Sequence, residues 1–202
     1  MQLYYFDFLA PRRAVAFAKH INAPVEYVRV DFAKGQNKSP EYLALNPLGR
    51  VPTLVDGDLV LWEADAIMCH LARKLAPELW PQDERLIEIV RWMSWNNQHF
   101  NRWGGELYFQ QIIKPRFRIG DPDPAAIAEA QKFWRNYAGL LDNHLKSREW
   151  LVGKDLSVAD FAVAAALPWA EPAAVPIAEF PEIGRWYAQL EALPAWRDPY
   201  PN

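Results

Sequence analysis

Residues 34–67 read KGQNKSPEYLALNPLGRVPTLVDGDLVLWEADAI, and this stretch decides the fold. Within it, SPEYLALN (39–46) predicts a short helix, with Ser39 as the N-cap and Pro40 in the first turn. The apolar runs PTLV and LVLW follow, and the Asp56-Gly57-Asp58 turn between them predicts a β-hairpin. Residues 63 to about 75 then show the apolar spacing of a helix. The segment therefore predicts helix, strand, strand and helix.

Upstream of this segment, LYYF (3–6) and VEYVRV (25–30) have the composition of strands, and Pro11 opens a helical stretch to about residue 21. Downstream, nearly every stretch has helical spacing: IEIVRWMSWNNQHFNRW, AAIAEAQKFWRNYAGLLDNHL, SVADFAVAAAL and EIGRWYAQLEAL. We therefore predict a mixed α/β domain over residues 1–76, a linker over 77–85 that contains Pro77 and Pro81, and an all-helical domain over 86–202.

Composition excludes several function classes. The formal net charge of -3 and the pI near 5.8 give no reason to expect nucleic acid or an anionic membrane as a partner. A single cysteine, Cys69, excludes an internal disulfide, and the four histidines lack metal-ligand spacing. The apolar run 161–170 is too short to span a bilayer, and no leader peptide is visible. We expect a soluble cytoplasmic protein without a metal.

The 34–67 stretch, together with LSVADF (156–161), resembles the cytosolic glutathione transferases of the bacterial type, and the resemblance extends over essentially the whole chain. It implies a thioredoxin-like domain followed by a helical bundle domain. It also implies that glutathione is the co-substrate, that no metal takes part, and that the protein is a homodimer acting in detoxification. The function implied is conjugation of the glutathione thiolate to a small apolar electrophile.

The resemblance also implies a glutathione site. Val51-Pro52 matches the family's cis-proline, where the Val51 backbone pairs with the cysteinyl backbone of glutathione. Glu63 matches the acid that pairs with the γ-glutamyl ammonium group, and Lys38 and Arg50 match basic positions that hold the glycyl carboxylate. Each of these residues also has a purely structural reading, as a strand start, a first-turn acid or a solvated surface cation.

Two positions depart from the family pattern, and both lack a hydroxyl group. Ala64 stands where the family has serine or threonine, so only the helix N-terminus remains for the γ-glutamyl carboxylate. The loop FDFLAPRR (6–13) has no serine, threonine or cysteine, and the usual serine position falls near Leu9 or Ala10. Tyr5, matching the tyrosine of other members, is a tentative thiol activator. The alternatives are the N–H groups that open the first helix, or Arg12 or Arg13.

Aromatic residues of the second domain predict a pocket for the electrophile. Trp95, His99 and Trp103 recur at helical spacing, with Trp92 before them, and Phe8, Leu9 and Trp169 are expected across from this stripe. Packing in the core is the alternative interpretation of the same stripe. For His99 the alternative is a core histidine whose ring nitrogens are hydrogen-bonded within the protein. Ser157 and Asp160 form a capping box with a structural role, and Cys69 is expected to be inert packing.

Three functions remain open at the level of sequence. The first is a glutathione transferase. The second is a non-catalytic ligand-binding or protein-interaction module of the same fold, favoured by the missing hydroxyls at Ala10 and Ala64. The third is a glutathione-dependent reductase or peroxidase, which would use the thiol of glutathione itself.

Overall fold

The computed structural model describes residues 1–201 and divides them into two compact units. The first unit comprises Met1–Pro81 together with the C-terminal segment from Glu191 onward, and the second comprises Gln82–Leu190. No helix in the described chain is both long enough and apolar enough to cross a membrane.

The first unit contains a four-stranded sheet in the order β2-β1-β3-β4. The strands β1 (Gln2–Tyr5) and β2 (Glu26–Arg29) are parallel, and β3 (Thr53–Asp56) is antiparallel to both β1 and β4 (Leu59–Trp62). The predicted hairpin is confirmed, because β3 and β4 meet around Gly57, whose φ of 62° suits glycine.

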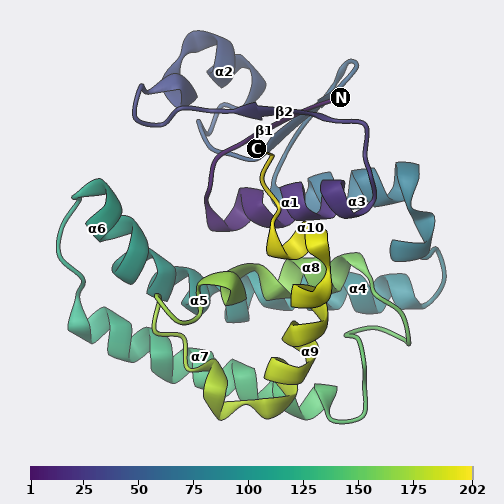
Figure 1. Cartoon of the computed structure of the whole chain (residues 1–202), viewed down its shortest axis with the longest axis vertical. Helices are drawn as coiled ribbons and strands as arrows, with labels where there is room; N and C mark the ends of the chain where they lie inside the picture. Colours follow the sequence, from purple (N-terminus) through teal and green to yellow (C-terminus); the bar gives the residue numbers. More distant parts are fainter. Residues whose placement is uncertain (202) are drawn as a thin grey trace. The chain divides into compact units, whose positions relative to one another are not determined.

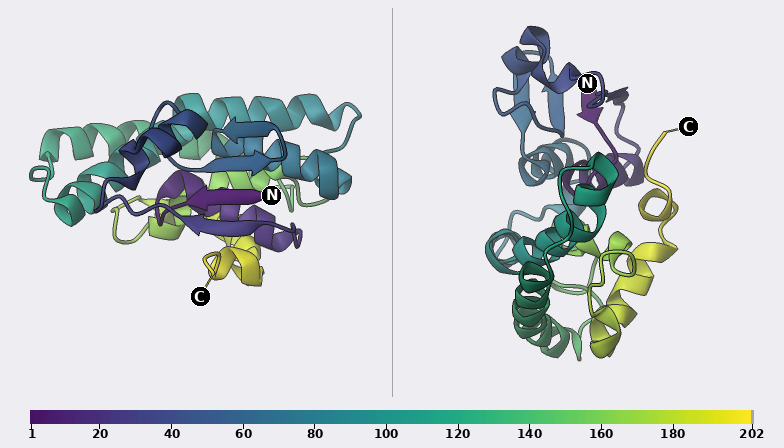
Figure 2. Two further views of the ribbon diagram at one scale, coloured as in Figure 1. Left: turned by 90° about the horizontal axis from the view of Figure 1, so that it is seen from above. Right: turned by 90° about the vertical axis from the view of Figure 1, so that its left-hand side faces the viewer.

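Helices cover both faces of this sheet (Figures 1 and 2). The helices α1 (Leu9–His20) and α3 (Ala64–Leu75) contact each other on one face, and α2 (Pro40–Leu45) lies on the other. Short 3-10 turns, η1 (Gln36–Lys38) and η2 (Pro77–Leu79), complete the unit. Ser39 caps α2 by accepting a hydrogen bond from the Tyr42 N–H at 3.2 Å, as predicted. The β-α-β-α-β-β-α order is that of the thioredoxin-like fold, which confirms the predicted fold class of this domain.

The second unit is all helical. Its first helical run is α4 (Arg85–Trp95), the π turn η3 (Asn96–Phe100), α5 (Asn101–Tyr108), the π turn η4 (Phe109–Ile113) and α6 (Lys114–Phe117). The remaining elements are α7 (Pro124–Leu145), α8 (Val158–Val163), the 3-10 helices η5 (Ala164–Trp169) and η6 (Ile177–Glu179), and α9 (Pro181–Ala192).

The helices of the second unit are fixed by a close approach at a glycine and by capped N-termini. A Cβ on Gly104 of α5 would lie 2.8 Å from the Ala166 Cβ, so only glycine permits this approach of α5 to η5. Asp123 caps α7 by accepting from the Ala125 N–H at 2.9 Å. The predicted capping box of Ser157 and Asp160 is present at the start of α8.

The C-terminal segment is placed differently from the sequence-based division, which assigned residues up to 202 to the helical domain. The short helix α10 (Pro194–Arg197) packs against α1, so this segment belongs to the first unit. Arg12 donates to the Trp196 carbonyl and lies 4.8 Å from the centre of its ring. These two residues are 184 positions apart in the chain, which is why sequence spacing did not reveal the contact.

Candidate active site

A small cavity of about 160 Å³ opens in the first unit where the loop before β3 meets the starts of α1 and α3. Its lining contains five residues that the sequence predicted for glutathione binding or for the thiol region: Ala10, Arg50, Val51, Pro52 and Glu63. The lining also contains Asn46, Leu48 and Trp62, which sequence reasoning missed. All three missed residues lie within the stretch over residues 34–67, and Trp62 directly precedes Glu63, so their nearness to matched positions was the available signal.

The cavity wall at Val51 is held by a network of buried polar groups. The Val51–Pro52 peptide bond is cis, as the resemblance implied. The Tyr42 hydroxyl donates to the Arg50 carbonyl at 2.6 Å, and the Asn46 amide donates to the same oxygen at 2.9 Å. Among residues 1–201 the main chain of Val51 itself makes no hydrogen bond. The loop is therefore fixed while one peptide edge stays available to an extended ligand.

Glu63 forms the opposite wall, in a backbone conformation that side chains rarely adopt. Its φ of 74° and ψ of 120° turn the chain from β4 into α3, and an observed outlier of this kind is a reason to suspect function. No side chain caps α3 at Glu63, so the N–H groups of its first turn keep their partial positive charge. Ala64 begins α3 and is buried, at 1% exposure. The site thus offers a carboxylate beside an anion-binding helix terminus.

The two basic residues predicted to hold the glycyl carboxylate differ in their position relative to the cavity. Arg50 is exposed and lines the cavity, whereas Lys38 is exposed and lies outside the lining. Asn37 is buried, and its amide donates to the Gly49 carbonyl at 2.9 Å, so this amide holds the loop. A Cβ on Gly49 would lie 2.9 Å from the Asn37 carbonyl oxygen, which makes glycine necessary at this approach.

Comparison with known proteins decides the family. The family description "Glutathione S-transferase, N-terminal domain" matches residues 1–73, and "Glutathione S-transferase, C-terminal domain" matches residues 106–194. The chain belongs to the glutathione S-transferase family.

Two related sequences and one solved structure show which kinds of protein this chain is similar to. A probable glutathione S-transferase of Oryza sativa subsp. japonica is 31% identical, over 91% of this chain and 87% of the length of the rice protein. FtsZ-localized protein A of Caulobacter vibrioides is 34% identical, over 78% of this chain and 73% of its own. The crystal structure of a theta class glutathione S-transferase from Xanthomonas axonopodis pv. citri, with glutathione bound, superposes with a TM-score of 0.87. It is 31% identical and covers 97% of this chain and 94% of its own.

Tyr5 of this transferase does not reach the cavity, which contradicts its tentative role as thiol activator. Strand alternation turns Tyr5 to the same face of the sheet as the buried Leu3. Its ring stacks on Tyr200 at 5.6 Å and meets Tyr27 edge-on at 6.4 Å. Burial raises the pKa of the Tyr5 hydroxyl above its ordinary value. Tyr5 is therefore a packing residue that anchors the C-terminal segment.

The two alternative cations near the thiol region are also engaged elsewhere. Arg12 binds Trp196, and Arg13 forms a buried ion pair with Asp65 of α3 at 3.1 Å. This ion pair ties α1 to α3 and fixes the two helix starts that meet at the cavity. Ala10, in the first turn of α1, is the α1 residue that lines the cavity. Pro11 of that turn has no N–H group, and the Arg12 N–H donates to the Phe8 carbonyl at 3.1 Å, so the N–H groups of Leu9 and Ala10 are the ones without an acceptor within the helix.

The residues predicted for the electrophile pocket are found in separate packing clusters of the two units. In the first unit Phe8 packs against Phe6 and Phe32, with ring centroids 4.7 and 5.1 Å away. Leu9 is half-buried in the first turn of α1. These contacts account for Phe8 as part of an aromatic cluster beside Val51.

In the second unit the aromatic stripe of Trp95, His99 and Trp103 is present, and its rings contact residues of α7. His99 stacks on Tyr137 at 4.9 Å, Trp95 meets Tyr137 edge-on, and Trp103 stacks on Phe133 at 4.6 Å. Trp169 contacts Tyr108 at 5.1 Å. The packing reading therefore accounts for these rings, and their contacts give no support to a role as electrophile pocket. Cys69 is also inert, because burial raises the pKa of its thiol to about 12.

Within residues 1–201 no group of three or more histidine, cysteine or acidic side chains is arranged to hold a metal ion.

Proposed function

We propose that this glutathione transferase binds glutathione in the cavity of its first unit and joins the thiolate to a small apolar electrophile. The cysteinyl backbone of glutathione pairs with the free peptide edge of Val51. The γ-glutamyl carboxylate lies on the N–H groups that begin α3, and its ammonium group pairs with Glu63. Arg50 holds the glycyl carboxylate, and Lys38, at the end of η1, is the second basic residue assigned to the same group.

One observation supports this proposal more than any other. The Val51 peptide edge, the Glu63 carboxylate and the uncapped start of α3 meet at a single cavity, and each matches a different part of glutathione. The related Xanthomonas structure has glutathione bound, as its description states. We also expect the protein to be a cytoplasmic homodimer, as the resemblance implies.

The reaction requires the thiol to lose its proton to solvent water before sulfur attacks. The thiolate sulfur then forms the bond to the electrophilic carbon, and the bond from that carbon to a leaving group such as chlorine breaks, with its electron pair leaving on chloride. Because Ala10 has no hydroxyl, the first-turn N–H groups of α1 and the positive end of its dipole stabilise the thiolate.

A second candidate is a ligand-binding or protein-interaction module without catalysis. The missing hydroxyls at Ala10 and Ala64 favour it. One relative that is 34% identical is named for its localisation to FtsZ and not for a transferase activity. The two candidates differ in whether the protein accelerates conjugation.

The proposal is tested by steady-state conjugation of glutathione to an aryl chloride, measured as kcat/KM. We expect a rate well above the uncatalysed reaction, and we expect Ala10→Ser to raise it roughly tenfold, since one added hydrogen bond shifts a thiol pKa by about one unit. Leu9→Ser is the matched control, because Leu9 lies in the same helical turn outside the cavity lining. A wild-type rate equal to the uncatalysed one would favour the non-catalytic module.

A further inference from the structure

The last described residues of the chain form a segment that runs along α1 of the first unit. After α9 the chain forms the short helix α10, and residues 194–201 all belong to the first unit. Figure 1 shows α10 beside α1, with the chain continuing from α10 toward the sheet. We call residues 194–201 the C-terminal strap. None of its residues lines the cavity of the first unit, so any effect on the site is indirect.

The C-terminal strap holds both ends of the loop that leads from β1 into α1. Before the loop, the ring of Tyr200 stacks on Tyr5 at the end of β1, with ring centroids 5.6 Å apart. After the loop, Arg12 in the first turn of α1 donates through Nη2 to the Trp196 carbonyl oxygen at 2.5 Å. One segment therefore fixes the points where the loop over residues 6–8 begins and ends.

The contact between Arg12 and Trp196 is part of the core. Arg12 is 8% exposed and Trp196 is 1% exposed. The guanidinium carbon lies 4.8 Å from the centre of the indole ring, so Arg12 packs on the ring while it bonds the carbonyl of the same residue. That carbonyl belongs to the end of α10, where carbonyl groups have no acceptor role within the helix and a cation is favourable. These contacts hold the planar guanidinium in one position.

The first turn of α1 is an unusual place for a buried arginine. The positive end of the helix dipole lies there, so acidic residues are favourable and cations are not. The first turn of α1 nevertheless has no acidic residue, and Arg12 is followed directly by Arg13. Arg13 is compensated by Asp65 of α3, and Arg12 is held by α10. A side chain that departs from a local rule in this way is expected where a site requires it.

The main chain of the same turn connects Arg12 to the site. The Arg12 N–H donates to the Phe8 carbonyl at 3.1 Å and closes the turn, and Ala10 of this turn lines the cavity. The direction of the N–H groups of Leu9 and Ala10 therefore depends on where Arg12 is held. Such donors stabilise a developing anion only when they point at it, and a displacement of about 1 Å can cost roughly a hundredfold in rate.

We propose that the C-terminal strap positions the first turn of α1 for ionisation of the glutathione thiol, and that Arg12 is the positioning residue. Arg12 acts through the main chain of its own turn and does not touch glutathione. Loss of its contact with the strap displaces the N–H groups of Leu9 and Ala10 without removing any residue that binds glutathione. This inference rests on the glutathione site proposed above.

The test measures the pKa of the bound thiol in two variants, by ultraviolet titration of glutathione at saturating protein. Arg12→Met cannot donate to the strap, and Tyr200→Ala loosens the strap while every charge stays in place. We expect the thiol pKa to rise by about 0.5–1 unit in Arg12→Met, with kcat falling roughly three- to tenfold at neutral pH, and to rise less in Tyr200→Ala. The affinity for S-methylglutathione, which has no ionisable thiol, should stay unchanged in both variants.

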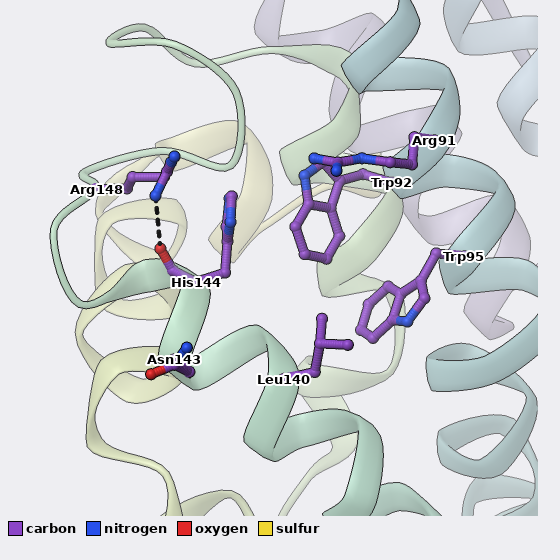
Figure 3. A pocket seen from close by; sticks show the side chains of 7 residues that line it. All are labelled: Arg91, Trp92, Trp95, Leu140, Asn143, His144 and Arg148. Carbon is purple, nitrogen blue, oxygen red and sulfur yellow. Dashed lines mark hydrogen bonds between the residues drawn. The ribbon is translucent and has the colours of Figure 1, made fainter.

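Two control variants and one conservative variant accompany these measurements. Lys19→Met breaks a strap contact at the last turn of α1, where Lys19 donates to the Asp198 carbonyl oxygen at 2.5 Å. Arg148→Met removes an arginine–carbonyl bond from the second unit, where Arg148 donates to the His144 carbonyl oxygen at 3.3 Å (Figure 3). Both controls should leave the thiol pKa unchanged. Arg12→Lys keeps the charge and a donor, and it should restore most of the wild-type pKa.

An unchanged thiol pKa in Arg12→Met overturns the inference, and a lower free energy of unfolding in that variant would then show a purely structural role. Equal pKa shifts in Lys19→Met and Arg12→Met overturn it as well, because the whole of α1 would then be loosened. Tyr200→Ala decides alone if Arg12→Met does not fold, and an unchanged pKa there overturns the inference. A wild-type thiol pKa equal to that of free glutathione overturns both this inference and the proposed function, whereas a lowered wild-type pKa leaves the function standing whatever the variants show.

Discussion

Replacing Asp160 with alanine is expected to lower the free energy of unfolding of the helical unit by about 3–5 kcal/mol. The Asp160 carboxylate is fully buried and accepts hydrogen bonds from four groups. These are the Ser157 N–H at 2.9 Å, the Ser157 hydroxyl at 3.0 Å, the Leu151 N–H at 3.0 Å and the Trp186 indole at 2.9 Å. Alanine leaves these donors buried without an acceptor.

The measurement is denaturant unfolding followed by far-ultraviolet circular dichroism, with Asp155→Ala as the matched control. Asp155 is exposed and lies two residues before Ser157 in the same loop, so its replacement should change the unfolding free energy by less than about 0.5 kcal/mol. Asp160→Asn, which keeps an acceptor oxygen, should fall between the two. A loss below about 1 kcal/mol for Asp160→Ala would show that the network does not hold α8 in place.

Replacing Glu63 with alanine should weaken glutathione binding about ten- to hundredfold, which corresponds to the 1.5–3 kcal/mol of a hydrogen bond to a charged group. Glu63 lines the cavity, and its carboxylate is the acidic group in that lining. Because Ala and Glu are equally restricted at a φ of 74°, the substitution does not relieve the backbone there. The effect is therefore attributable to the lost carboxylate.

Isothermal titration with glutathione measures this effect, and two variants bracket it. Asp58→Ala removes an exposed acid from the turn between β3 and β4 and should leave the affinity unchanged. Ala64→Ser adds the missing hydroxyl at the start of α3 and should tighten binding by up to about tenfold. Equal affinity for wild type and Glu63→Ala would contradict the assignment of the γ-glutamyl subsite.

The first domain could be predicted from sequence because its signals are local. The hairpin at Gly57 and the cap at Ser39 each depend on residues within a few positions of one another, as does the capping box at Asp160 in the second unit. Val51 and Glu63 also belong to one continuous stretch of sequence, residues 34–67, and both line the cavity.

The errors came from features that depend on distant parts of the chain. Alternation showed that Tyr4 and Tyr5 face opposite ways, but only the folded sheet shows that Tyr5 faces α1 and meets Tyr200. The spacing of Trp95, His99 and Trp103 defined a stripe without identifying α7 as its partner. The π turn η3 carries no recognised sequence signal, and it interrupts the stretch over residues 87–103 that was predicted to be helical.

The central claim is that the cavity of the first unit lowers the pKa of the glutathione thiol without a side-chain donor. An ultraviolet pH titration of glutathione at saturating protein, following thiolate absorbance, tests it most directly. We predict that bound thiolate forms at least about one pH unit below the pKa of free glutathione, because the start of α1 stabilises the anion. Superposition of the bound and free titration curves would contradict the claim.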